Sequence, residues 1–317
     1  MFLRLLLTVL GAFVMMLPGY IARRRGYITA EMVTGLARVH VGAIYPCLIF
    51  TTITRQFSLA DLERAWVLPA CSLGIMVLGW GIGLAAGTAM RLHPGPQKSA
   101  MQFQCTINNY SFLPLTLISG LFGSDYVAAL LLSTLGAELA LWTLGVHAIG
   151  GKGLGREHLR HLLSPPLLAM YAAGACLVGM HLGGISRSIL AEPGSNVYVL
   201  HNSLYILGQG TIPLAMIIAG ARLATLTWKD VHLPLTWATT ALRLVAIPLA
   251  AVALLHVLPL TETVRQVMTV VAVMPVSVAS MLFSELYGGD KDLINGTVLL
   301  SHLLALATIP LLLAWTL

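Results

Sequence analysis

Charged residues are scarce in this sequence: they make up 9% of its 317 residues, whereas 57% are hydrophobic. In soluble domains roughly a quarter of all residues are charged. A chain with so few charged residues cannot keep its apolar surface from water by folding alone. The mean hydropathy of +0.86 points the same way. The composition therefore excludes an ordinary soluble domain and predicts an integral membrane protein.

Long polar connections are missing too, as is the alternation of apolar and polar residues typical of outer-membrane barrel strands. Apolar runs recur instead, of the roughly 20 residues that a helix rising ~1.5 Å per residue needs to cross a core of ~30 Å. They lie at about 3–22, 33–54, 66–90, 99–122, 126–149, 164–184, 197–221, 234–257, 265–287 and 293–316. The first run has no small-residue cleavage site, so we expect a retained helix. We therefore expect an all-α membrane protein of ten transmembrane helices, with residues 1–317 in one membrane domain.

Motifs for metal binding and catalysis are also lacking. The four cysteines, at positions 47, 71, 105 and 176, have neither close spacing nor histidine partners, so they predict packing and no zinc or redox site. In "REHLRH" (156–161), His158 and His161 offer two metal ligands at most, and solvated loop charge is the favoured interpretation. The sequence has no HExxH motif, and "YGGD" (287–290) only approximates an intramembrane protease motif. We expect no enzyme, no catalytic residue, no metal and no cofactor.

The net charge of +6 comes from basic residues in short loops without interleaved aromatic residues, so nucleic acid is not an expected partner. Of the 18 Lys and Arg residues, twelve fall in or beside loops that follow odd-numbered helices, and five on the side of the termini. The positive-inside rule then predicts a multi-pass membrane protein with both termini outside the cytoplasm.

The two halves of the chain carry similar residues at corresponding positions. Pro46 corresponds to Pro213 at a step of 167 residues, and Asp125 to Asp290 at a step of 165. Each half holds five predicted helices, an odd number, so the second half enters the membrane from the opposite side. The sequence therefore predicts two inverted repeats, at about 1–150 and 164–317.

The fourth predicted helix contains Asn108, Asn109 and Pro114, and the ninth contains Pro275 at a related position. A proline inside a membrane helix frees carbonyl groups that lipid cannot satisfy, so both helices are expected to break where they face protein or water. A proline kink satisfied by a neighbouring helix is the alternative. Half-helices starting near 115 and 276 would turn positive dipole ends toward the centre and favour an anion there. The asparagine amides, with Ser277 and Ser280, would add hydrogen-bond donors.

Glu138 lies inside the fifth predicted helix, where an ionised carboxylate costs at least ~2.5 kcal/mol. The position that corresponds to it in the second repeat is 303, beside His302. Glu138 and His302 could form a proton-coupling pair. An ion pair between Glu138 and Arg243, or a protonated carboxyl bonded to a carbonyl, is the favoured structural alternative.

Successive segments of the chain resemble landmarks of the auxin efflux carrier (AEC) family in its bacterial branch. They are "PGYIARRRGYIT" (18–29), "YPCLIF" (45–50), "NYSFLPL" (109–115), "ELALWTLGV" (138–146), "SPPLLA" (164–169), "IPLAMIIAGARL" (212–223), "LRLVAIPL" (242–249) and "LSHLLALATIPLLL" (300–313). The resemblance implies the bile acid/sodium symporter-like superfamily fold, with two inverted five-helix repeats and broken helices 4 and 9 crossing. Tyr110 stands where the family often has glycine, Thr116 where a proline is expected, and Glu138 where a neutral polar residue is expected.

The resemblance further implies an alternating-access carrier of small organic anions, carboxylates, which bind where helices 4 and 9 cross. It places that carrier in the plasma membrane, the bacterial inner membrane. The expected substrate-binding residues are Asn108, Asn109, Tyr110, Pro114, Pro275 and Ser277. Glu138, His302 and Arg243 are candidates for coupling to protons or sodium. The expected partners are a carboxylate substrate and the lipid bilayer, with a homodimer possible at family level. An anion channel or a membrane sensor on the same scaffold is the alternative function.

Overall fold

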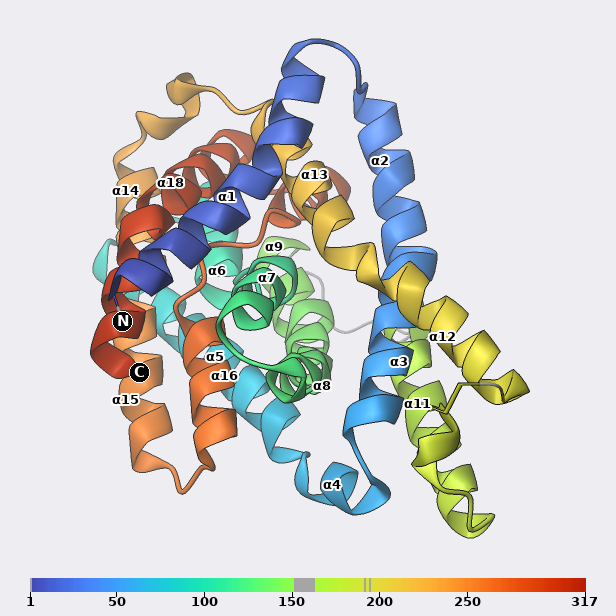
Figure 1. The fold of residues 1–317 in the computed structure, drawn as a ribbon. Helices are drawn as coiled ribbons and strands as arrows, with labels where there is room; N and C mark the ends of the chain where they lie inside the picture. Colours follow the sequence, from blue (N-terminus) through green and yellow to red (C-terminus); the bar gives the residue numbers. More distant parts are fainter. Residues whose placement is uncertain (1, 151–162, 191, 194) are drawn as a thin grey trace.

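The computed structural model describes residues 2–150, 163–190, 192–193 and 195–317, which form helices joined by short connections (Figure 1). These residues contain no β-strand beyond an isolated antiparallel bridge between Asn108 and Val276. Large apolar side chains face outward, among them Leu3, Leu200 and Ile206, which are 65%, 71% and 64% exposed. Such extensive apolar surface suits contact with lipid. The helical fold class is confirmed.

Among the described residues, eight helical stretches are long and apolar enough to cross a membrane. They are Phe2–Arg24, Ala30–Gln56, Leu59–Ala89, Ser124–Gly150, Pro165–Leu182, Asn196–Leu223, Pro234–Val257 and Lys291–Thr316. Each coincides with one predicted segment. The other two predicted segments are interrupted: the first is α6 (Pro96–Thr106) followed by α7 (Phe112–Leu121), and the second is α16 (Glu262–Ala272) followed by α17 (Ser280–Tyr287). A multi-pass helical membrane protein is confirmed, whereas ten crossings, inverted repeats and a single domain stay predictions.

The long stretches divide into shorter elements. In the first half these are α1 (Phe2–Arg24), α2 (Ala30–Val39), η1 (His40–Ile44), α3 (Tyr45–Gln56), α4 (Leu59–Arg64), α5 (Val67–Ala89), α8 (Ser124–Ala140), η2 (Leu141–Gly145) and α9 (Val146–Gly150). In the second half they are α11 (Pro165–Leu182), η4 (Arg187–Leu190), α12 (Asn196–Gln209), α13 (Thr211–Leu223), η5 (Trp228–Val231), α14 (Pro234–Ala241), η6 (Leu242–Ala246), α15 (Ile247–Val257) and α18 (Lys291–Thr316).

Two of the π-helical turns have a cause in the sequence. η1 ends at Ile44, two residues before Pro46, and η6 ends at Ala246, two residues before Pro248. Proline has no N–H to donate, and its ring clashes with the carbonyl four residues earlier. A π-helical turn widens the helix at that point and lets it continue past the proline without a break.

Glycines set the closest helix packing. A Cβ atom on Gly19 of α1 would lie 1.9 Å from the carbonyl oxygen of Ile217 in α13, and one on Gly220 would lie 1.9 Å from the oxygen of Met16. The backbones of α1 and α13 therefore touch at two reciprocal points. Small residues allow this close approach, which is the usual source of helix association in lipid.

The breaks of the two interrupted segments, with the helix ends that precede them, lie in the interior of the helix bundle. Figure 1 shows α6, α7 and α16 near the centre, with α11 and α12 beside α3 on one side and α14 and α15 on the other. Residues 100–106 of α6 and 267–272 of α16 are all buried. A helix that is buried on every face needs neighbours all round. The two helix breaks are consequently shielded from lipid.

Candidate functional site

The first break spans residues 107–111, between α6 and α7. The sequence predicted a half-helix from about 115, with Pro114 at the break, but α7 begins at Phe112 and Pro114 lies within its first turn. Proline is tolerated there because the N–H groups of a first turn have no acceptor within the helix. The predicted position of the break is therefore corrected: Pro114 follows the break and does not form it.

The second break spans residues 273–279 and contains Pro275. The predicted start of its half-helix, at 276, is four residues too early, since α17 begins at Ser280. The Oγ atom of Ser277 accepts a hydrogen bond from the N–H of Ala279 at 3.2 Å, and its carbonyl accepts the N–H of Ser280 at 3.1 Å. This turn occupies the residues that were expected to be helical.

The two interrupted segments meet at their breaks. Asn108 pairs with Val276 in the antiparallel bridge, and the N–H of Asn109 donates to the carbonyl oxygen of Pro275 at 2.9 Å. The side chain of Asn108 adds a bond from Nδ2 to the carbonyl of Val271 at 2.5 Å. Each extended stretch thus satisfies part of the backbone polarity of the other, as buried irregular backbone in a membrane requires.

The two asparagines have different surroundings. Asn108 is fully buried, and it uses its amide nitrogen to join the two breaks. Asn109 is half-buried; its Oδ1 accepts the N–H of Leu113 at 3.5 Å, and its Nδ2 donates to no other described residue. Asn108 therefore has a structural bond, whereas Asn109 keeps a free donor at the crossing.

Arg243 is completely buried in η6 beside the crossing. Its guanidinium donates to three carbonyl oxygens: Cys105 at 3.3 Å, Ala272 at 2.9 Å and Met274 at 3.2 Å. The oxygens of Cys105 and Ala272 lie at the C-terminal ends of α6 and α16, where helix carbonyls lack intrahelical partners and carry negative partial charge, and the oxygen of Met274 lies in the second break. Arg243 therefore caps both first half-helices at once.

Glu138 of α8 lies in a polar group with two aromatic side chains. Its Oε1 accepts the hydroxyl of Tyr110 at 2.8 Å, and its Oε2 accepts Nε1 of Trp142 at 3.0 Å. The neighbouring Ser111 donates its hydroxyl to that of Tyr45 at 3.1 Å. Tyr110 is thus bonded to α8 and Ser111 to α3, two helices that pack against each other.

The structure does not join the three predicted coupling residues. Within the described chain, neither Glu138 nor Arg243 forms an ion pair, so the alternative of a Glu138–Arg243 pair is wrong in this conformation. His302 is buried; its Nδ1 faces the carbonyl of Val298 at 2.8 Å, and its Nε2 has no partner among the described residues. No hydrogen bond links His302 to Glu138 within that part of the chain. A coupling role for these residues stays a prediction.

Positive and negative groups meet at the crossing, where the carboxylate of Glu138 and the C-terminal ends of α6 and α16 offset Arg243 and the N-terminus of α7. The N-terminus of α7 lies at Ser111 and Phe112, beside the free amide of Asn109, and Arg243 contributes a full positive charge. The N-terminus of α17 contributes less than expected, because the turn at 277–278 already accepts the N–H groups of Ser280 and Met281. The carboxylate of Glu138 is the opposing charge.

Three contributors to this arrangement were not among the predicted site residues: Tyr45, Ser111 and Trp142. Both aromatic residues lie in segments that the family resemblance had marked, "YPCLIF" and "ELALWTLGV". The bond between Ser111 and Tyr45 depends on how α3 packs against the first break, which no local pattern encodes. Trp142 lies four residues after Glu138, so helical spacing could have indicated that contact.

The cysteines and the candidate metal ligands are considered separately. The four cysteines are free thiols. The described residues contain no group of three or more His, Cys, Asp or Glu side chains that could hold a metal ion. The "REHLRH" segment, with His158 and His161, lies outside the described residues, as does most of the loop at 150–163.

Comparison with known proteins gives concordant matches over the whole chain. A family model described as membrane transport protein matches residues 5–159 and 156–313. An uncharacterized transporter of Methanothermobacter thermautotrophicus is 26% identical over 309 residues, which cover 96% of each chain. Another uncharacterized transporter, from Methanocaldococcus jannaschii, is 24% identical over 315 residues with the same coverage. The chain belongs to the membrane transport protein family, that of the auxin efflux carriers.

Proposed function

We propose that this transporter is a secondary carrier of small organic anions, carboxylates, which bind where the two interrupted segments cross. The observation that carries the proposal is the half-buried Asn109, whose amide nitrogen has no partner among the described residues. An amide donor beside a helix N-terminus and a buried guanidinium is suited to hydrogen-bond a carboxylate. Asn109, Tyr110 and the backbone around Pro275 and Ser277 are the proposed contacts, with Asn108 and Pro114 as their supports.

The proposed mechanism is alternating access by two inverted five-helix repeats. The pairing of α1 with α13 has a counterpart in the pairing of α3 with α11, as two repeats would produce. The crossing would remain at the centre while the helices around it move, so that the same site opens to each side in turn. The chain would act in the plasma membrane as a single membrane domain, with a homodimer as its proposed assembly.

We favour protons over sodium as the coupling ion. Arg243 already supplies a fixed positive charge to the carbonyl oxygens of Cys105, Ala272 and Met274, the kind of ligand that a sodium ion would need. Glu138 is the proposed proton carrier. Its partner Tyr110 has a hydroxyl that can donate to the carboxylate or turn to accept from the protonated acid.

Counterflow in proteoliposomes tests the proposed activity. Vesicles loaded with one of a panel of mono- and dicarboxylates should accumulate the same labelled anion from outside, transiently and saturably. A channel, the alternative function on the same scaffold, would give flux without counterflow. The proposal would be contradicted if correctly inserted protein showed saturable counterflow with none of the carboxylates.

The proposed orientation places both termini outside the cytoplasm, and thiol labelling tests it. In a chain with its four cysteines replaced by alanine, Tyr27→Cys in the connection after α1 should resist an impermeant thiol reagent in intact cells. Ser186→Cys, in the connection after α11, should react. The opposite labelling pattern would overturn the charge argument.

A further inference from the structure

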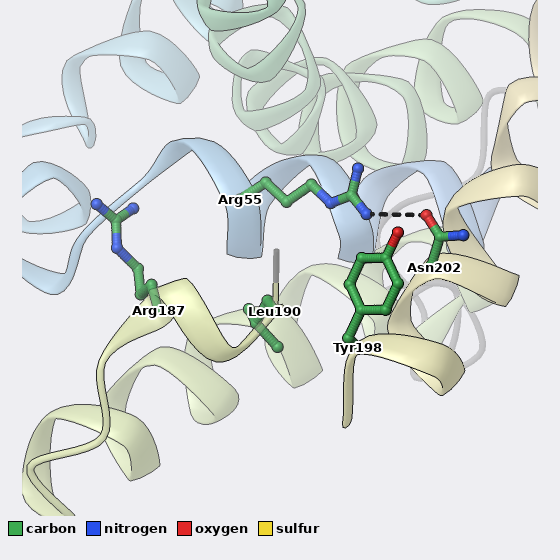
Figure 2. Close-up of a pocket in the computed structure, with 5 residues that line it drawn as sticks. All are labelled: Arg55, Arg187, Leu190, Tyr198 and Asn202. Carbon is green, nitrogen blue, oxygen red and sulfur yellow. Dashed lines mark hydrogen bonds between the residues drawn. The ribbon is translucent and has the colours of Figure 1, made fainter. Parts of the chain in front are cut away.

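A cavity with polar side chains in its lining is found at the far end of α3, away from the crossing. Its volume is about 330 Å³, and it is lined by Arg55, Arg187, Leu190, Tyr198 and Asn202 (Figure 2). The last turn of α3, η4 and the first turns of α12 contribute these side chains. Arg55 lies ten residues after Tyr45, roughly 15 Å further along the helix at ~1.5 Å per residue. The cavity is therefore separate from the proposed transport site.

Arg55 is held in place with most of its donors unused. Its guanidinium carbon lies 3.9 Å from the ring centroid of Tyr205, and its Nη2 donates to Oδ1 of Asn202 at 3.4 Å. Its Nε is buried and has no partner among the described residues. A guanidinium has five N–H donors in a planar fork, and stacking on an aromatic ring fixes the plane of that fork. Arg55 is thus preorganised for an oxyanion.

Arg187 lies at the other end of the cavity. Figure 2 shows its guanidinium well separated from that of Arg55, with Leu190 between the two. Arg187 forms no ion pair within the described part of the chain, and no carboxylate lines the cavity. Two positive ends with an apolar middle match an elongated ligand with two negative ends better than a small spherical anion.

We propose that this cavity binds a small dicarboxylate, with one carboxylate on Arg55 and the other toward Arg187. The hydroxyl of Tyr198 lies beside Asn202 in Figure 2 and is available as a further donor to the carboxylate on Arg55. The binding itself does not depend on the proposed transport function. If that function holds, the cavity raises the local concentration of substrate at one membrane face, as charged clefts do for their ligands.

Protection of arginines from phenylglyoxal tests the proposal at residue level. The purified full-length protein in neutral detergent is treated with phenylglyoxal, digested, and analysed by mass spectrometry for modification at each arginine. Succinate should slow modification of Arg55 and Arg187 several-fold, and acetate should do so only at much higher concentration. Arg64, which is exposed on α4 and does not line the cavity, is the internal control.

The other arms separate the ligand sources and the two sites. Inorganic phosphate and nanodiscs with phosphatidylglycerol test a phosphate or a lipid headgroup. Protection by these alone, equal protection by acetate, or equal slowing at Arg64 would each overturn the dicarboxylate site. In Asn109→Ala, succinate should still protect Arg55, whether or not the transport proposal holds. Succinate should also raise the unfolding temperature of Asn109→Ala. This stabilisation should be lost when Arg55→Gln and Arg187→Gln are added to Asn109→Ala, and kept when Arg64→Gln is added instead.

Discussion

Arg243 is a guanidinium with no exposed surface in a protein that spans a membrane, so its charge must be matched inside the fold. The structure matches it with three backbone carbonyls, two from the ends of half-helices and one from the second break. The residue was considered from sequence as a partner for Glu138. A carboxylate partner could be guessed from sequence; a cap made of carbonyls requires knowing that α6 and α16 end at the same place.

Replacement of Arg243 should therefore destabilise the protein. In Arg243→Met the three carbonyls lose their donor, and each buried group left unsatisfied costs about 1–3 kcal/mol. We expect a clearly lowered midpoint of thermal unfolding in detergent, with Arg243→Lys intermediate because an ammonium cannot reproduce the planar fork. A midpoint equal to wild type in Arg243→Met would show that the cap is not needed.

Glu138 is the second residue to test, because its hydrogen bonds with Tyr110 and Trp142 can be kept while its charge is removed. Glu138→Gln should retain exchange of substrate for substrate and lose uptake driven by a pH gradient, since glutamine cannot carry a proton. Transport in proteoliposomes with and without an imposed gradient measures both. His302→Gln should shift the pH dependence of uptake without abolishing exchange.

Continued concentration of substrate in response to a pH gradient by Glu138→Gln would make Glu138 structural. In the structure Glu138 bonds to an aromatic hydroxyl and an indole, whereas the structural alternatives were an ion pair with Arg243 and a bond to a carbonyl. Sequence could identify the buried carboxylate but not its bond with Tyr110, since Tyr110 belongs to the extended stretch of another segment.

At the scale of helices, the proximity of α1 and α13 depends on two glycines. Gly19→Ala would place a methyl group 1.9 Å from the carbonyl oxygen of Ile217, so the helices must separate. Gly11→Ala in the same helix meets nothing within 4 Å and should gain up to ~1 kcal/mol of helix propensity. We expect a lower unfolding midpoint for Gly19→Ala and an equal or higher one for Gly11→Ala. Equal midpoints in both variants would contradict the packing account.

The helix breaks show what a sequence pattern can and cannot specify about an element. Two adjacent asparagines and Pro275 in apolar runs were enough to predict that both segments are interrupted and that they meet. The limits of the breaks were wrong by several residues, because proline was assumed to mark each break. Pro114 fits a first helical turn instead, and the turn at Ser277 delays the start of α17.

At the scale of the whole molecule, the crossing is connected to surrounding helices on several sides. Arg243 ties it to η6, Glu138 and Tyr110 tie it to α8, and Ser111 ties it to Tyr45 of α3. Composition and periodicity predicted the helical membrane class and the positions of the long helices. They could not predict these ties, which join residues far apart in the chain.

The central claim is that the crossing binds a carboxylate through Asn109, and equilibrium binding to the purified protein tests it most directly. The carboxylate that shows counterflow is titrated against wild type, Asn109→Ala and Asn108→Ala. We expect the affinity of Asn109→Ala to fall about tenfold or more, as loss of a charge-assisted hydrogen bond of ~1.5–3 kcal/mol implies, with an unfolding midpoint near that of wild type. Asn108→Ala should mainly lower the midpoint, because Asn108 joins the two breaks. Wild-type affinity in a folded Asn109→Ala protein would contradict the account.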